Sequence, residues 1–272
     1  MKVFIYDNKE KDSLGLLLKK LVEILNAQNI KYQVLEDEDL VGEKHADAIF
    51  SLGGDGTILF LTEFANKNGI PIIGINAGKL GFLTEFERYD MEKAVRLLKD
   101  DQLKRDERIT LTVEFNGKKF YALNDVFVQR TYSKEVGCMI ADTSVYLDGS
   151  IMDEFKGDGI IVGTSTGSTA YSLSAGGPIL TPQLEAFVIT PIAAHSITQR
   201  SVVYNSDSTC VVKLSGRTHA GLFVDGNYVG EMVSGDKISI VKADSKTTFL
   251  RKKDFDFFNR LSEKMKNNTR GV

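Results

Sequence analysis

In the first hundred residues, short apolar runs alternate with segments whose apolar residues recur every three or four positions. The runs are typical of buried strands and the spaced segments of amphipathic helices. Strands are predicted at 1–6, 31–35, 48–52 and 70–75, and helices near 14–25, 56–68 and 91–98. This alternation favours an α/β domain with a parallel sheet, and ligands of such sheets lie beyond the carboxyl ends of the strands.

The pattern changes near residue 101, where alternation at every second position becomes the rule. Three pairs of such segments flank Asn116-Gly117, Asp148-Gly149 and Asp225-Gly226, which are typical hairpin turns. We therefore expect an α/β domain over 1–100 and a β-rich domain over 101–253. The tail, 254–272, has helical spacing and is expected to pack back on the first domain.

Composition narrows the class of protein. A net charge of −3 over 272 residues gives no general attraction to nucleic acid or anionic membranes. The two cysteines and three scattered histidines form no zinc or redox-metal pattern. The first residues lack the pattern of a signal peptide, and no apolar run is long enough to span a bilayer. These features predict a cytoplasmic protein without nucleic-acid or membrane partners.

A glycine-rich turn with one acidic residue, Gly53 to Thr57, directly follows the strand 48–52. A helix that starts after such a turn presents free backbone N–H groups, which favour a bound phosphate. Asp55 would repel a phosphate, so a different task is expected, such as accepting a proton from a hydroxyl or holding a metal ion. The alternative is a tight turn in which Asp55 only caps the helix.

Three further segments carry candidate chemistry, at 76–83, 124–125 and 156–178. The first has glycines that permit close approach of a ligand, and the second pairs an amide with a carboxylate. For each of these two, taken alone, an ordinary turn is the better interpretation. The third is dense in glycine and small hydroxyls after an apolar strand and carries Tyr171, which can stack on a base; its alternative is a flexible surface loop.

Several other chemistries find no support. No GxxxxGK[ST] phosphate loop and no full protein-kinase motif set occurs. Ser168 lacks the flanking glycines of a hydrolase nucleophile turn, which disfavours a nucleophilic serine.

Together the four segments resemble the NAD kinase family over nearly the whole chain. The shared motifs are GGDGT (53–57), NxGxxGFL (76–83), an Asn-acid pair (124–125) and GDG…TxTGSTAYxxSxGGP (157–178). GGDGT alone also resembles the phosphate turn of phosphofructokinases and of diacylglycerol or sphingosine kinases. The full set in this order is much more specific.

The resemblance implies ATP-dependent phosphorylation of the adenosine ribose 2′-hydroxyl of NAD, giving NADP. It implies the two-domain NAD kinase fold, with a parallel, Rossmann-like sheet and a β-rich C-terminal domain. It also implies a homodimer or homotetramer, and a divalent cation, Mg²⁺, that accompanies ATP. Polyphosphate is an alternative phosphate donor.

The resemblance assigns Asp55 as the general base. The ATP phosphates would lie against the glycine turn, at Gly53, Gly54, Gly56 and Thr57. Residues implied in binding NAD are Gly56, Phe82, Asn124, Asp125, Lys156, Asp158, Thr166, Thr169, Ala170, Tyr171, Ser174, Ala193 and Asn227. No residue is implied as a metal ligand.

Within that set, the resemblance implies that Asn124 and Asp125 bind the NAD riboses. It also implies that Asp158 contacts the nicotinamide amide and that Phe82 packs by the adenine. The pockets for the two rings would be lined by Thr169, Ala170, Tyr171 and Ser174, with Thr166 and Ala193 nearby.

Three positions depart from the family pattern. The family usually has Glu where this chain has Asp125, often has Arg where it has Lys156, and has Gln where it has Asn227. Two alternative functions stay open, another GGDGT-type kinase such as a lipid kinase, and a non-catalytic dinucleotide-binding module. Thermal shifts with NAD, NADP, diacylglycerol and ATP would separate a dinucleotide site from a lipid site, and turnover would separate an enzyme from a sensor.

Overall fold

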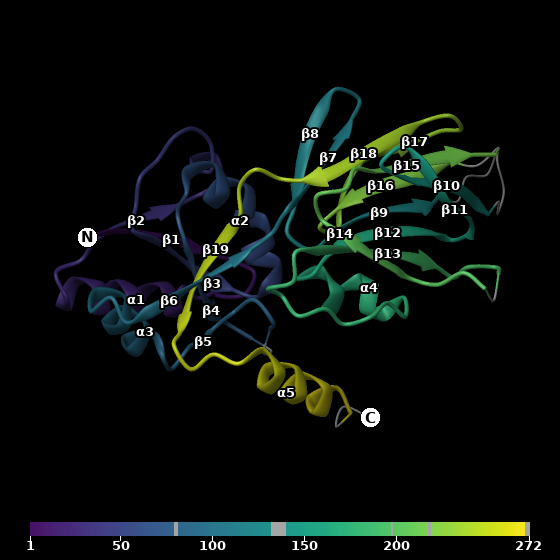
Figure 1. Ribbon diagram of the computed structural model, residues 1–272. Helices are drawn as coiled ribbons and strands as arrows, with labels where there is room; N and C mark the ends of the chain where they lie inside the picture. Colours follow the sequence, from purple (N-terminus) through teal and green to yellow (C-terminus); the bar gives the residue numbers. More distant parts are fainter. Residues whose placement is uncertain (79–80, 132–139, 197, 217–218, 270–272) are drawn as a thin grey trace. The chain divides into compact units, whose positions relative to one another are not determined.

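The computed structural model describes residues 1–78, 81–131, 140–196, 198–216 and 219–269. It divides into two compact units, the first formed by Met1–Arg108 with Thr247–Val272 and the second by Ile109–Lys246. The strands and α-helices of both units are labelled in Figure 1.

The first unit is built on one mixed sheet with the strand order β2-β1-β3-β4-β19-β6, and β5 pairs with β4. Its strands are β1 (Lys2–Asp7), β2 (Lys31–Leu35), β3 (Ala48–Gly53), β4 (Ile72–Asn76), β5 (Phe86–Glu87), β6 (Leu103–Arg108) and β19 (Thr247–Lys252). Its helices are α1 (Leu16–Ala27), η1 (Asp37–Asp39), α2 (Asp55–Asn68), α3 (Met91–Lys99) and α5 (Phe257–Thr269). All pairs are parallel except β19 with β6.

The four predicted strands of the first half are confirmed. The central strands β3 and β4 are buried along their whole length, which is typical of parallel strands covered on both faces, whereas β2 is mostly half-buried. The predicted domain limits, 100 and 253, differ from the limits of the first unit, which takes in β6 and β19. β6 has the sequence LKRDER, and its pairing partner β19 lies far along the chain. Neither strand therefore carries a local pattern that assigns it to this sheet.

The second unit consists of two six-stranded antiparallel sheets, β11-β10-β15-β18-β7-β8 and β14-β13-β12-β9-β16-β17. The strands of the first are β7 (Leu111–Phe115), β8 (Lys118–Ala122), β10 (Ala141–Leu147), β11 (Ser150–Gly157), β15 (Cys210–Ser215) and β18 (Lys237–Lys242). Those of the second are β9 (Asp125–Arg130), β12 (Gly159–Thr164), β13 (Ala186–Ile192), β14 (Val202–Asn205), β16 (Ala220–Val224) and β17 (Asn227–Met232). Two short helices, η2 (Gly167–Thr169) and α4 (Tyr171–Ser174), follow β12.

The three predicted hairpins are confirmed as β7–β8, β10–β11 and β16–β17. Their turns place Asn116, Asp148 and Asp225 at φ values of 50°, 49° and 46°, each followed by a glycine with positive φ. These are the backbone angles that Asn-Gly and Asp-Gly turns supply. One apolar core draws on strands of both sheets, including Val113, Val128 and Val212.

Among the residues that the structure describes, no helix is long and apolar enough to cross a membrane.

Candidate active site

The glycine turn lies at the carboxyl end of β3, where α2 begins at Asp55. A Cβ on Gly53 would lie 2.2 Å from Oγ1 of Thr57, so close packing requires glycine there. A Cβ on Gly54 or Gly56 would meet none of the described atoms within 4 Å, so these two glycines are open. The Thr57 hydroxyl accepts a hydrogen bond from the side-chain amide of Asn8, 2.9 Å away. The first turn of a helix leaves N–H groups without partners in the helix, and here there is room beside them for an anion.

The carboxylate of Asp55 accepts hydrogen bonds from the next loop of the sheet edge. The backbone N–H groups of Phe82, Leu83 and Thr84 donate to it at 2.8, 3.0 and 3.4 Å. The residue that caps α2 is Gly54, so the alternative in which Asp55 serves only as a helix cap is wrong. An ionised carboxylate can accept about four hydrogen bonds, so about one acceptor position remains for a ligand.

The hydrogen bonds between the Asp55 carboxylate and this loop require glycine at position 81, since a Cβ on Gly81 would lie 2.0 Å from Oδ1 of Asp55. At the other end of the same segment, the Asn76 amide donates to both oxygens of Glu87 at 3.1 Å, and the N–H of Gly78 donates back to Asn76 at 3.0 Å. Lys79 and Leu80, also part of the predicted motif, lie outside the described residues.

Phe82 presents its ring to the C-terminal helix. The ring centroids of Phe82 and Phe257 are 6.5 Å apart, and Nζ of Lys264 lies 5.5 Å from the Phe82 centroid. The side chain that was expected to pack by the adenine therefore contacts α5, and part of it stays exposed.

Behind the loop lies a buried cluster of charges on β6, β19 and the segment before β5. Arg251 is fully buried and contacts Asp106 at 2.7 Å and Glu85 at 3.2 Å, and Arg108 also pairs with Asp106. Burial by itself raises the pKa of Asp106, but the two guanidinium groups outweigh it and hold that pKa below its usual value. Burial, with Arg108 nearby, lowers the pKa of Arg251, while Asp106 and Glu85 oppose the change.

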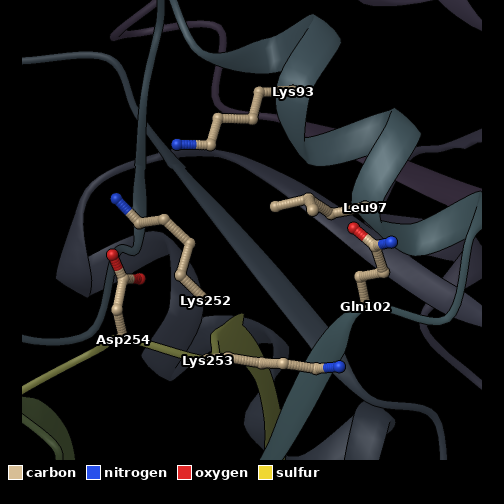
Figure 2. Close-up of a pocket in the computed structure, with 6 residues that line it drawn as sticks. All are labelled: Lys93, Leu97, Gln102, Lys252, Lys253 and Asp254. Atoms are coloured by element: carbon tan, nitrogen blue, oxygen red, sulfur yellow. The ribbon is translucent and has the colours of Figure 1, made fainter.

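A hollow of about 280 Å³ opens beside this cluster, and Figure 2 shows the side chains around it. Its lining residues are Lys93, Leu97, Gln102, Lys252, Lys253 and Asp254. Lys252 links the hollow to the cluster, because its Nζ lies 3.8 Å from Glu85. None of the predicted site residues lines this hollow.

In the second unit, Asn124 and Asp125 are held by Asp225, a residue that the sequence analysis assigned only to a hairpin turn. The carboxylate of Asp225 accepts hydrogen bonds from the N–H groups of Leu123, Asn124 and Asp125 at 2.8, 2.8 and 3.0 Å. The Asp125 carboxylate is itself buried, and it accepts a hydrogen bond from the backbone N–H of Tyr171. The buried carboxylate of Asp125 thus lies close enough to the half-buried carboxylate of Asp225 to be affected by its charge.

Both carboxylates of this pair hold protons more tightly than usual. Burial, and then the charge of Asp225, raises the pKa of Asp125 to about 7. Burial raises the pKa of Asp225 to about 6, although its three backbone hydrogen bonds work against the rise.

The hydroxyl-rich segment after β12 packs directly on Asn124. A Cβ on Gly167 would lie 2.0 Å from the Asn124 carbonyl oxygen, and the N–H of Thr164 donates to the same oxygen at 2.8 Å. Several hydroxyls serve the fold: Ser168 donates to the Ser165 carbonyl and accepts from the N–H of Leu180. Ser172 likewise bonds Thr190 at 2.8 Å.

Of the residues in this segment that were expected to touch NAD, Thr166 is buried, Thr169 and Ala170 are half-buried and Ser174 is exposed. The Thr169 hydroxyl donates to the Thr166 carbonyl at 3.2 Å.

Tyr171 begins a row of aromatic rings on the β9–β16 face. Its ring meets Phe127 edge-on at 4.9 Å, Phe127 stacks on Phe223 at 4.7 Å, and Phe223 meets Tyr228 at 5.5 Å. Burial, followed by the charges of Asp158 and Asp125, raises the pKa of the Tyr171 hydroxyl, while a hydrogen bond with Gln129 lowers it. The structure thus brings Asn124, Asp125 and Tyr171 together, with Asp158 close enough to affect the Tyr171 hydroxyl.

Asp158 forms an ion pair with Arg130 at 2.8 Å, a partner that sequence reasoning missed. Its neighbour Gly157 is fixed by packing, since a Cβ there would lie 2.7 Å from the Ile192 carbonyl. Ala193, at φ 45°, helps to line a hollow of about 350 Å³ in the same unit.

Lys156 and Asn227 are both exposed, and Lys156 pairs with Asp142 at 3.6 Å. The described contacts link neither residue to the group around Asn124. In the part of the chain that is described, no group of three or more His, Cys, Asp or Glu side chains is arranged to hold a metal ion.

Comparisons with known proteins find relatives of this chain over nearly its whole length. Residues 4–103 match the family model for the ATP-NAD kinase N-terminal domain, and residues 123–252 match that for the ATP-NAD kinase C-terminal domain. The NAD kinase of Caldicellulosiruptor bescii is 37% identical over 98% of this chain and 100% of its own length. The NAD kinase of Fusobacterium nucleatum is 35% identical over 98% of this chain and 97% of its own length.

Two solved structures share the fold. The yeast NADH kinase, solved with NADH, has a TM-score of 0.82 and 23% identity, and covers 97% of this chain and 86% of its own. The Archaeoglobus fulgidus NAD kinase, solved with ATP, has a TM-score of 0.80 and 24% identity, and covers 98% of this chain and 99% of its own.

Proposed function

The chain belongs to the NAD kinase family, and on that premise we propose that Asp55 is the general base of an NAD kinase reaction. In this reaction ATP phosphorylates the adenosine ribose 2′-hydroxyl of NAD, giving NADP. A lipid kinase and a non-catalytic binding module are not favoured, since the relatives matched over almost the whole chain are NAD kinases.

The observation that carries the proposal is the carboxylate of Asp55 at the start of α2, beside the open glycines. A ribose hydroxyl is a weak nucleophile, and a carboxylate within hydrogen-bond reach can orient it and accept its proton. The hydrogen bonds from Phe82, Leu83 and Thr84 fix the direction of the carboxylate and leave about one acceptor position for that proton.

The glycine turn would bind the ATP phosphates, at Gly53, Gly54, Gly56 and Thr57. The open space at Gly54 and Gly56 fits a phosphate next to the helix N-terminus. A divalent cation, Mg²⁺, would be held through the ATP phosphates next to Asp55, and it would offset the negative charge there.

For NAD, we propose that Asn124 and Asp125 bind the riboses and that Tyr171 stacks on a ring. The row of rings from Tyr171 to Tyr228 offers flat apolar faces, and the Asp125 carboxylate is fixed beside it by the Tyr171 N–H. Phe82, Asp158, Thr166, Thr169, Ala170 and Ala193 stay proposed contacts of NAD, and so do the exposed Lys156, Ser174 and Asn227.

The first experiment is NADP formation from NAD, ATP and Mg²⁺ by the wild-type protein and by Asp55→Asn. General-base catalysis typically contributes 10²- to 10⁴-fold, so Asp55→Asn should lower kcat by about that range. The change also removes an acceptor of backbone N–H groups, and this second effect needs its own control.

Asp12→Asn is the matched control. Asp12 likewise accepts three backbone hydrogen bonds, from Leu16, Leu17 and Leu18 at 2.8–3.0 Å, but it lies outside the glycine turn. We expect Asp12→Asn to lower the melting temperature and leave kcat close to that of the wild type. Equal losses of kcat in the two variants would reject the role of Asp55 as the base. A folded wild type that binds NAD without forming NADP would reject the reaction with ATP, and repeating the assay with polyphosphate would test that donor.

We further propose that the chain acts in the cytoplasm as a homodimer or homotetramer. Light scattering on the purified protein measures the molar mass, and a monomer would contradict the assembly.

A further inference from the structure

The loop that holds Asp55 is itself held from its other side by one arginine. Phe82, whose N–H donates to Asp55 at 2.8 Å, accepts on its carbonyl a hydrogen bond from the Arg251 guanidinium at 3.4 Å. Three residues further on, the Glu85 carboxylate accepts from the same guanidinium at 3.2 Å. The segment 82–85 is therefore fixed between the carboxylate of Asp55 and the guanidinium of Arg251.

Arg251 can hold the loop because it is rigid. It is fully buried on β19, and its Nε donates to Asp106 on β6 at 2.7 Å. The rings of Phe255 and Phe249 lie 4.2 and 5.0 Å from the centre of the guanidinium. A move away from these partners would leave a buried charge unpaired, which is costly, so the pairs and the rings hold the guanidinium in this position.

We propose that Arg251 is a positioning residue for Asp55, which acts by fixing the loop from Phe82 to Glu85. The inference rests on the proposed role of Asp55 as general base. It predicts that the geometry of the base depends on a side chain that contacts neither substrate.

The guanidinium is required because its planar fork bonds three acceptors at once, on Asp106, Glu85 and Phe82. A lysine keeps the charge, but its single ammonium cannot reach the same three groups in fixed directions. Arg251→Lys therefore tests the fork while it leaves a cation in the cluster.

Arg108→Lys is the matched control. Arg108 belongs to the same cluster, is also buried and pairs with Asp106, and it has no described bond to the segment 82–85. The two variants make the same chemical change on either side of one carboxylate. A general loss of stability should therefore affect both.

Two readouts test the proposal, steady-state kinetics with NAD and hydrogen exchange of the amides of residues 82–84. For Arg251→Lys we expect kcat to fall about tenfold or more, because small displacements of a catalytic group are costly, with a smaller change in KM. We also expect faster exchange at 82–84. For Arg108→Lys we expect kcat and the exchange at 82–84 near wild type, even where its melting temperature falls equally.

The proposal is overturned if exchange at 82–84 is unchanged in Arg251→Lys, or if both variants lose kcat in proportion to their melting temperatures. Should Arg251→Lys not fold, Glu85→Gln breaks the same link from the loop side, and the same two readouts decide. A wild type that forms no NADP would refute the proposed function alone, because the exchange measurement would still report whether Arg251 holds the loop.

Discussion

Asp225 and Asp125 are joined by two hydrogen bonds that run in opposite directions. The Asp225 carboxylate accepts the N–H of Asp125 at 3.0 Å, and the N–H of Asp225 donates to the Asp125 carbonyl at 2.9 Å. These two hydrogen bonds connect the turn between β16 and β17 to the first residue of β9. The Asp225 carboxylate therefore lies among the three N–H groups of residues 123–125. The backbone direction of Asn124 and Asp125 at the start of β9 depends on this carboxylate.

Asp225→Asn should therefore weaken the binding of NAD. An amide has one acceptor oxygen, and its NH₂ would face an N–H donor of the segment 123–125, so the segment would shift. We expect KM for NAD to rise about tenfold, with a smaller change in kcat, measured by steady-state kinetics. Asp148→Asn is the control, because Asp148 also sits at positive φ in an Asp-Gly turn and accepts one N–H, from Thr209 at 2.9 Å. An equal rise of KM in both variants would contradict the prediction.

The same pair of carboxylates should make stability depend on pH. The pKa of Asp125 in the folded chain, about 7, lies above its ordinary value of 3.8, so the folded state binds the proton more tightly than the unfolded state. The stabilisation is then present in full below about pH 4 and is lost as the pH rises through about 7. Asp225, with a pKa of about 6, acts in the same direction.

Melting temperatures of the wild type and of Asp125→Asn, measured from pH 5 to pH 8, test this dependence. Asparagine cannot ionise, so we expect the wild type to lose stability relative to the variant by at least about 1 kcal/mol over this range. Parallel curves for the two proteins would show that Asp125 is already ionised at pH 5.

The glycine turn and the hairpins could be predicted from the sequence because their causes are local. The run before Gly53 is apolar except at Ser51, and an Asp-Gly or Asn-Gly pair fixes the turn of a hairpin by itself. The roles of Asp225 and Arg251 could not be predicted in this way. Their partners lie far away in the sequence, at 123–125 and at 82–85, and no spacing within one segment reveals them.

The small hydroxyls after β12 show a different limit. Their density predicted a ligand-binding segment, but Ser168 and Ser172 use their hydroxyls inside the fold. A hydroxyl that binds a phosphate and one that binds a buried carbonyl have the same sequence pattern. Only the burial of each residue, complete for Ser168, separates the two uses.

Ser168→Ala should accordingly affect stability and not catalysis. The change leaves the buried N–H of Leu180 without its acceptor, which typically costs about 1–3 kcal/mol. We expect a lower melting temperature and a kcat within about twofold of the wild type when the assay is run well below that temperature. A loss of kcat of about a hundredfold or more in the folded variant would point to a direct part for this serine in the reaction.

Gly81→Ala should disturb Asp55 without touching any charged group. The new Cβ would lie 2.0 Å from Oδ1 of Asp55, so either the carboxylate or the loop must move. Overpacking of this kind typically costs about 1–3 kcal/mol of stability, and the displaced carboxylate should lower kcat by about tenfold or more.

Gly78→Ala is the control for this change, because a Cβ on Gly78 meets no atom of the described residues within 4 Å. We expect its kcat and melting temperature to stay near those of the wild type. Steady-state kinetics and thermal melting of both variants, in parallel, provide the comparison. If Gly81→Ala folds and turns over at the wild-type rate, the reaction tolerates a displaced Asp55 carboxylate, and the role of Asp55 as a rigidly placed base is wrong.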